Sequence, residues 1–100
     1  MQPLKNYQKK YLRGLGNRLK PVVYIGKNGL SEQVLTSINE ALDTHELIKV
    51  KYVEFKQQRH ELNEQIMKRT NCEMPGQIGF TALFFRRNPD EDKQKIKLPE

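Results

Sequence analysis

The chain has too little of several features to belong to some common classes of protein. It has one cysteine in 100 residues, Cys72, so it forms no internal disulfide, and a reducing compartment is favoured. No apolar run approaches the length of a membrane span, and the N-terminus lacks the apolar core of a signal peptide. We therefore expect one cytoplasmic domain, folded over residues 1–88, followed by a C-terminal tail over 89–100. Its charges are mixed from Glu91 to Glu100, so we expect this part to be loose unless Ile96 and Leu98 pack on the domain.

Acidic side chains are also missing from the start of the chain. The first 30 residues contain seven Lys or Arg and no Asp or Glu, while the net charge of the whole chain is +6. The excess positive charge is therefore concentrated at one end of the sequence. Such a concentration indicates a nucleic-acid partner more than a general need for solubility.

The hydrophobic pattern predicts seven elements. Helical periodicity covers residues 4–19, 32–44 and 56–69, and strand-like patterns cover 22–25, 46–53, 73–80 and 81–87. A strand–helix–strand unit favours a parallel pair, and the last two strands suggest an antiparallel hairpin. We expect an α+β fold in two layers, ordered α-β-α-β-α-β-β, with a mixed four-stranded sheet. Five aromatic residues could stack nucleobases, although periodicity favours a place in the core for most of them: Tyr7, Tyr11, Tyr24, Phe84 and Phe85.

The stretch PVVYIGKNGL, residues 21–30, combines a short strand, a turn with two glycines and a helix start. Glycines at 26 and 29 permit a positive φ or a ligand pressed against the main chain. Lys27 and Asn28 form the tip, and Ser31 is a candidate N-cap for the next helix. A basic turn beside a helix N-terminus favours a phosphate. A tight strand-to-helix connection is the plainer explanation, and these residues alone do not decide between the two.

Several segments together resemble the YhbY family of small RNA-binding proteins, whose fold is called the CRM domain. The segments are KKYLRGL, the turn Gly26-Lys27-Asn28-Gly29, the run HELIKVK at residues 45–51, and Gly79 before an aromatic strand ending in Arg86. The resemblance covers about residues 4–87. It implies a fold similar to the C-terminal domain of bacterial translation initiation factor three. It also implies association with ribosomal RNA in precursors of the large ribosomal subunit.

Catalytic and metal-binding alternatives have weak support in the sequence. His45, His60 and Cys72 are too far apart to match a close pair of metal ligands. The glycine turn lacks the frame of a phosphate-binding loop with its lysine. A small nuclease or GTP-dependent factor is therefore disfavoured, and we expect no enzyme activity, metal, cofactor or small-molecule substrate.

We expect a monomeric RNA-binding protein that assists ribosome maturation and contacts no membrane. A general RNA chaperone or an intron-splicing cofactor is the alternative. Basic side chains would attract phosphates, and the turn would hold the RNA backbone. The candidate RNA-binding residues are Lys5, Lys9, Arg13, Lys20, Gly26, Lys27, Asn28, Gly29, Lys49, Lys51 and Arg86.

Overall fold

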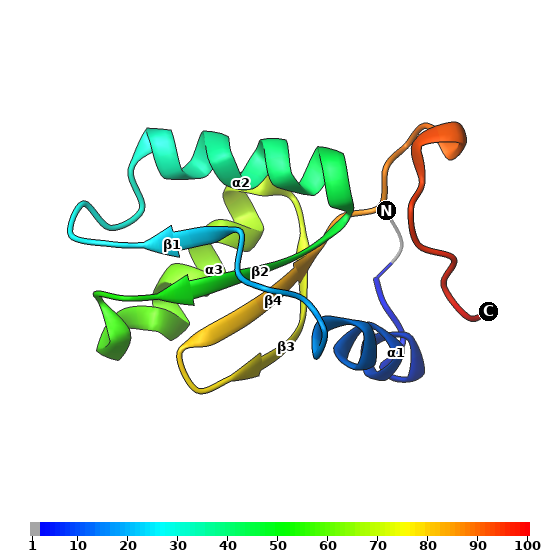
Figure 1. Ribbon diagram of the computed structural model, residues 1–100, viewed down its shortest axis with the longest axis horizontal. Coiled ribbons are helices and arrows are strands. Elements are labelled where there is room, and N and C mark those ends of the chain that lie inside the picture. Colours follow the sequence, from blue (N-terminus) through cyan, green and yellow to red (C-terminus); the bar gives the residue numbers. More distant parts are fainter. Residues whose placement is uncertain (1–2) are drawn as a thin grey trace.

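The computed structural model describes residues 3–100 and contains the predicted elements in the predicted order (Figure 1). The helices are α1 (Asn6–Gly16), α2 (Glu32–His45) and α3 (Arg59–Thr70), with short 3₁₀ turns at Lys56–Gln58 and Glu91–Lys93. The strands are β1 (Val23–Ile25), β2 (Leu47–Tyr52), β3 (Glu73–Ile78) and β4 (Thr81–Phe85).

The four strands form one mixed sheet in the order β1-β2-β4-β3. β1 pairs with β2 in parallel, and β4 pairs antiparallel with both β2 and β3. Gly79, with φ of +57°, makes the turn of the β3–β4 hairpin. The expected α+β fold with a mixed four-stranded sheet is confirmed.

One face of the sheet packs against α2 and α3. Strand alternation sends Ile48, Val50 and Tyr52 to this face, and all three side chains are buried. Ile38 and Leu42 from α2 and Ile66 from α3 complete the core there. In Figure 1, α2 runs along one side of the strands and α3 lies behind them.

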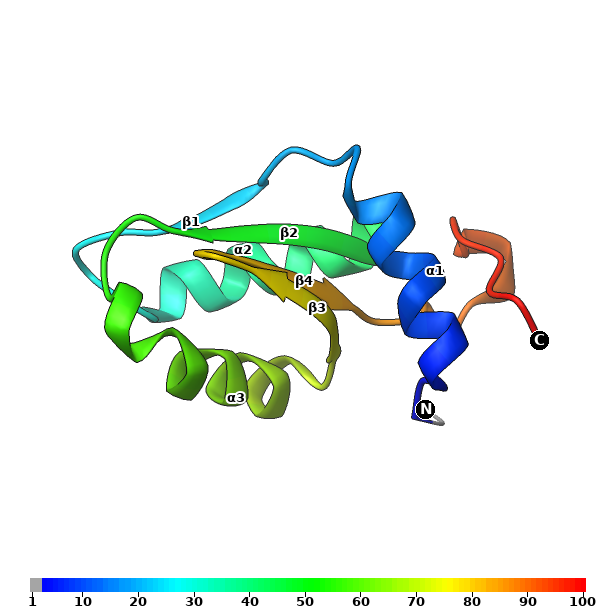
Figure 2. The same cartoon turned by 90° about the horizontal axis from the view of Figure 1, so that it is seen from below.

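A second, smaller core lies on the opposite face, at one end of the sheet. Leu4 and Leu12 pack there against Leu47, Leu83 and Phe85. At the end of α1, the backbone of Gly16 comes so close to Leu83 that a Cβ would lie 2.5 Å from its Cδ1. This contact explains a glycine that weakens the helix by itself. Figure 2 shows α1 crossing one end of the sheet and leaving the other end uncovered.

The tail packs against the domain through the two apolar side chains whose packing the sequence left open. Ile96 and Leu98 lie against the second core. The buried carboxylate of Glu46 accepts hydrogen bonds from the backbone amides of Asn88 (2.7 Å), Lys95 (2.6 Å) and Ile96 (3.0 Å). Because three amides of the tail share one buried acceptor, residues 88–96 are held in a fixed path.

Fewer of these aromatic side chains lie in the core than the sequence predicts. Phe84 and Phe85 are buried, but Tyr7, Tyr11 and Tyr24 are each more than two-fifths exposed. The helical stripe that contains Tyr7 and Tyr11 is wider than the contact α1 makes with the sheet end. Tyr24 lies in a strand whose neighbours face the core, so its own side chain faces the other way.

Candidate nucleic-acid interface

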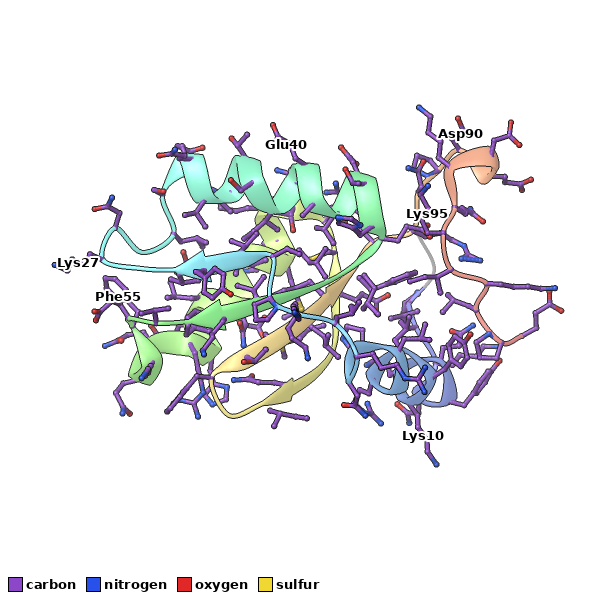
Figure 3. The ribbon with its side chains drawn as sticks, in the orientation of Figure 1. Lys10, Lys27, Glu40, Phe55, Asp90 and Lys95 are labelled. Atoms are coloured by element: carbon purple, nitrogen blue, oxygen red, sulfur yellow. The ribbon has the colours of Figure 1, made fainter. Side chains whose placement is uncertain are left out.

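A four-residue turn between β1 and α2 carries the predicted Gly-x-x-Gly segment. The amide of Gly29 donates to the carbonyl of Gly26 at 3.0 Å and closes the turn. Lys27 and Asn28 are exposed at the tip. Figure 3 shows Lys27 at one extreme of the molecule, with Lys10 of α1 toward the other. The turn is therefore accessible to a large ligand from outside the domain.

The structure explains one of the two glycines of the turn and leaves the other unexplained. Gly29 has φ of +62°, and a ring atom of Phe55 lies 3.3 Å from the position of a Cβ. Gly26 has φ outside the left-handed region, and nothing in the described chain lies within 4 Å of its Cβ position. The fold therefore requires glycine at position 29 and does not require it at position 26.

The loop after β2 supports this turn. Backbone amides of Val53 and Glu54 both donate to the carbonyl of Ile25 at 3.0 Å. Phe55 then adopts a left-handed conformation, with φ of 57° and ψ of 32°, which is uncommon for a bulky residue. Its side chain, 41% exposed, lies near Lys27 in Figure 3. The turn is thus braced from one side and open on the other.

The start of α2 is capped as the sequence predicts. The Ser31 hydroxyl accepts a hydrogen bond from the amide of Val34 at 3.2 Å. Glu32 follows in the first turn, and its carboxylate pairs with the guanidinium of Arg69 at 2.6 Å. Glu32 is thus paired with Arg69, and Lys27 at the tip forms no ion pair among residues 3–100.

A second basic site is a groove between α1 and the sheet face opposite α2 and α3. Its volume is about 290 Å³. Arg13 from α1 and Lys49 and Lys51 from β2 line it, with Ile78 and Leu83 from the β3–β4 hairpin. The groove brings Arg13 together with Lys49 and Lys51, two predicted binding residues that lie much later in the sequence. The sequence does not reveal its apolar floor, because no periodicity shows which part of the second face α1 leaves open.

The Arg13 side chain is fixed over the edge of the hairpin. Its guanidinium donates to the carbonyl of Pro75 at 2.9 Å. Gly76 leaves the space for this side chain, because a Cβ there would lie 2.6 Å from Cδ of Arg13. The cation is therefore placed at the groove by packing and by a hydrogen bond, while the residue stays exposed.

The remaining predicted lysines lie at the α1 end of the molecule. Lys5 precedes α1 and Lys9 lies within it, while Lys20 is exposed in the connection to β1. The molecule is 38 Å long, and the glycine turn lies at its other end (Figures 1 and 2). The predicted residues therefore lie at both ends of the molecule and are not gathered at one point.

Comparison with known proteins places this geometry in a family. Residues 4–86 match the CRS1/YhbY (CRM) domain family. The chain belongs to this family. It is similar to an RNA-binding protein of Haemophilus influenzae, with 40% identity over 100 residues covering 99% of this chain and 98% of the relative. A probable RNA-binding protein of Pseudomonas aeruginosa is 38% identical over 87 residues, covering 86% of this chain and 84% of that relative.

A solved structure with the same fold supports the assignment of the CRM domain. It is the solution structure of a hypothetical Staphylococcus aureus protein, described in its title as a candidate for RNA binding. The TM-score is 0.80 at 32% sequence identity, over 97% of this chain and 100% of that one.

Arg86, one of the predicted RNA contacts, makes hydrogen bonds within this CRM domain. Its guanidinium donates to the side chain and backbone of Asn39 (2.8 and 3.1 Å), the carbonyl of Thr70 (2.6 Å) and the carboxylate of Asp43 (2.9 Å). Only 19% of the side chain is exposed. The arginine therefore joins α2 to the end of α3, and both terminal nitrogens of its guanidinium donate within the domain.

The described part of this CRM domain gives little support to a catalytic, metal-binding or membrane-spanning role. Cys72 is buried, and burial raises the pKa of its thiol, which makes it a poor nucleophile at neutral pH. Over residues 3–100, no cluster of three His, Cys, Asp or Glu side chains is placed to hold a metal ion. Among the same residues, no helix has the length and apolar character needed to cross a membrane.

Proposed function

We propose that this CRM-domain protein binds RNA through its glycine turn and the basic side chains of α1 and β2. The Haemophilus influenzae and Pseudomonas aeruginosa relatives carry RNA-binding names. Within that role we propose ribosomal RNA in precursors of the large subunit as the ligand, in the cytoplasm, with the protein acting as a monomer that assists maturation.

The proposed mechanism begins with electrostatic attraction. Phosphates release their condensed counterions when they meet Lys and Arg side chains, and this release drives binding without reading sequence. The cations proposed to meet the RNA backbone are Lys5, Lys9, Arg13, Lys20, Lys27, Lys49 and Lys51. The turn then holds the sugar-phosphate chain against its own backbone, as a Gly-x-x-Gly loop does in KH domains.

The observation that carries the turn's role is the empty space beside Gly26. Gly29 is explained by its positive φ and by Phe55, whereas neither backbone conformation nor packing explains Gly26. A ligand that lies directly on the main chain accounts for the missing side chain. The adjacent Lys27 and Asn28 supply a positive charge and hydrogen-bonding groups for a phosphate.

A Gly26→Ala variant tests this assignment. The alanine meets no neighbour, so the melting temperature should stay within about 2 °C of the parent protein, as for a surface change of under ~0.5 kcal/mol. Affinity for a ribosomal RNA fragment, measured by fluorescence anisotropy, should fall about tenfold because the Cβ holds the RNA backbone away.

Gly14→Ala is the matched control, because its Cβ also enters empty space, but on α1 and away from the turn. Its affinity should equal that of the parent. If Gly26→Ala binds as tightly as Gly14→Ala, the turn is not the contact, and Gly26 serves only the connection.

The ribosomal ligand and the absence of catalysis need separate tests. Crosslinking in cells followed by sequencing of the bound RNA should recover large-subunit precursor RNA. Recovery of RNAs from all classes would favour a general chaperone, and recovery of introns would favour a splicing role. Incubation of labelled ribosomal RNA with pure protein and divalent metal should leave the RNA intact, whereas cleavage would support a nuclease.

A further inference from the structure

The half of the sheet that α1 leaves uncovered carries exposed aromatic, aliphatic and basic side chains. Strand register places Tyr24, Lys51, Thr81 and Ile78 in one row across all four strands. Tyr24 is 53% exposed and Ile78 is 75% exposed. We call this row, together with the adjoining groove, the open sheet face. It extends from the groove at α1 toward the end of the domain that carries the glycine turn (Figure 2).

The groove beside this row has the size and shape of a small binding pocket. Its volume of about 290 Å³ is close to the lower end of the range for pockets that hold small organic groups. Its floor is apolar, made by the buried Leu83 and the more exposed Ile78, and the Arg13 side chain lies over Gly76 on the α1 side. A flat, partly apolar group such as a nucleobase fits such a floor.

The charge around the open sheet face indicates which class of ligand it can bind. Arg13, Lys49 and Lys51 are cations in the lining of the groove, and the lining within the described chain includes no acid. A protein segment of ordinary composition would leave these three charges without partners. A polyanion with flat apolar faces satisfies both the cations and the apolar floor.

Tyr24 adds a surface for stacking. Its side chain shares the sheet face with Lys51, its partner in the register of β1 and β2. An exposed aromatic ring beside a lysine lets a base stack while the lysine meets the adjoining phosphate. Stacking requires a base with a free face, so an A-form duplex, whose bases are already stacked, does not satisfy this arrangement.

We propose that the open sheet face binds single-stranded RNA, with one base stacked on Tyr24 and a neighbouring base seated in the groove over Leu83. This inference rests on the proposed function and specifies its ligand as an unpaired segment of RNA. Lys49, Lys51 and Arg13 hold the phosphates between the bases. The strand then continues toward the glycine turn.

The absence of tryptophan from the chain allows a direct test. A Tyr24→Trp variant has a single indole on the open sheet face, and Tyr11→Trp has one on the exposed side of α1, where the parent tyrosine is 43% exposed. Each is titrated with a single-stranded RNA of about ten nucleotides and with a hairpin duplex of the same composition. The indole fluorescence of Tyr24→Trp should be quenched by the single strand and little changed by the duplex. That of Tyr11→Trp should respond to neither RNA.

Affinities of side-chain variants complete the test. Tyr24→Ala should lose about fivefold or more in affinity for the single strand, which is the low end for one stacked base. Tyr24→Phe should bind like the parent, since it keeps the ring. Circular dichroism should show that both variants remain folded, because the side chain projects from the sheet.

The outcomes separate this inference from the proposed function. Salt-sensitive binding that is equally tight for duplex and single strand, with no quenching in Tyr24→Trp, overturns the stacking proposal and leaves RNA binding intact. No binding to either RNA overturns both. Unchanged RNA affinity in Tyr24→Ala, together with loss of a protein partner, would assign the open sheet face to protein contact and also overturn the proposal.

Discussion

At the scale of single residues, Glu46 shows how a charged side chain becomes part of the core. It is fully buried, and its carboxylate accepts three backbone amides of the tail. Its own carbonyl accepts the amide of Arg86 at 2.9 Å. Burying a charge is costly unless its hydrogen-bonding capacity is used, and here the tail uses it. The residue is thus a connection between the end of α2 and the tail.

We predict that Glu46→Ala lowers the free energy of unfolding by about 2–4 kcal/mol, because three amides lose a charged acceptor, and water replaces part of the loss since these bonds are only partly buried. Glu46→Gln should lose less, since its remaining amide oxygen still accepts from Lys95 and Ile96. Urea unfolding gives the energies, and limited proteolysis should cut the tail of the Ala variant first. Equal stability of the Ala variant and the parent would show that the tail contributes nothing to the fold.

A second prediction at this scale concerns Tyr52. Burial raises the pKa of its phenol well above the usual value, and the hydroxyl donates to Oδ1 of Asn63 at 2.6 Å. The unfolded chain ionises near pH 10, while the folded protein keeps the proton. Stability from this group is therefore complete below about pH 10 and is lost as the pH rises toward the folded pKa, by up to about 1.4 kcal/mol per pH unit.

Tyr52→Phe should be less stable at neutral pH but should show a flatter loss of stability above about pH 10. The comparison is best made in a Cys72→Ala background, because burial also raises the pKa of the Cys72 thiol and its titration changes stability in the same direction. Urea unfolding at several pH values from neutral into the alkaline range measures the slopes. Identical slopes in the two proteins would remove Tyr52 from the alkaline transition.

At the scale of elements, α1 gives a matched pair of glycines. Gly14 has nothing near its Cβ position, while a Cβ on Gly16 would overlap the side chain of Leu83. We predict that Gly14→Ala stabilises the protein by about 0.5–1 kcal/mol through helix propensity. Gly16→Ala should destabilise it by about 1–3 kcal/mol through overpacking. Thermal and urea unfolding would show the opposite signs, and a common sign would mean that α1 can shift freely on the sheet.

The helix α1 also shows which part of an element the sequence can predict. Its periodicity gives the helix, and its buried Leu12 lies on the predicted apolar side. The predicted stripe also includes Leu15 and Leu19, of which Leu19 lies beyond the end of α1 at Gly16, and both are more than a third exposed. Periodicity reports which residues share a side of a helix. It does not report how much of that side the rest of the protein covers.

The sequence predicts side-chain directions better in β2 than in α1, because successive side chains of a strand point to only two faces. Ile48, Val50 and Tyr52 turn to one face, so Lys49 and Lys51 turn to the other, as the sequence indicates. The sequence does not predict that Arg13, from a helix much earlier in the chain, lines the same groove as these lysines. Long-range packing decides that contact, and it also brings Arg86 to Asn39 of α2.

At the scale of the molecule, the positive charges lie along its length and not at one point. If about four to six phosphates are neutralised, log K should fall against log salt with a slope of about −3 to −5. Titrations of a ribosomal RNA fragment at several salt concentrations measure this slope. A slope near zero would point to a ligand other than RNA backbone.

The two cores of the molecule have only the central strands in common. β2 and β4 contribute side chains to both, whereas α2 and α3 belong to one core and α1 and the tail to the other. Local fluctuations can therefore release α1 and the tail while the larger core stays closed, and amide protons of β2 and β4 should exchange with solvent only on global unfolding. Such an opening would take Arg13 away from Lys49 and Lys51 and leave the glycine turn in place, so the two proposed RNA contacts, the groove and the turn, would have different lifetimes.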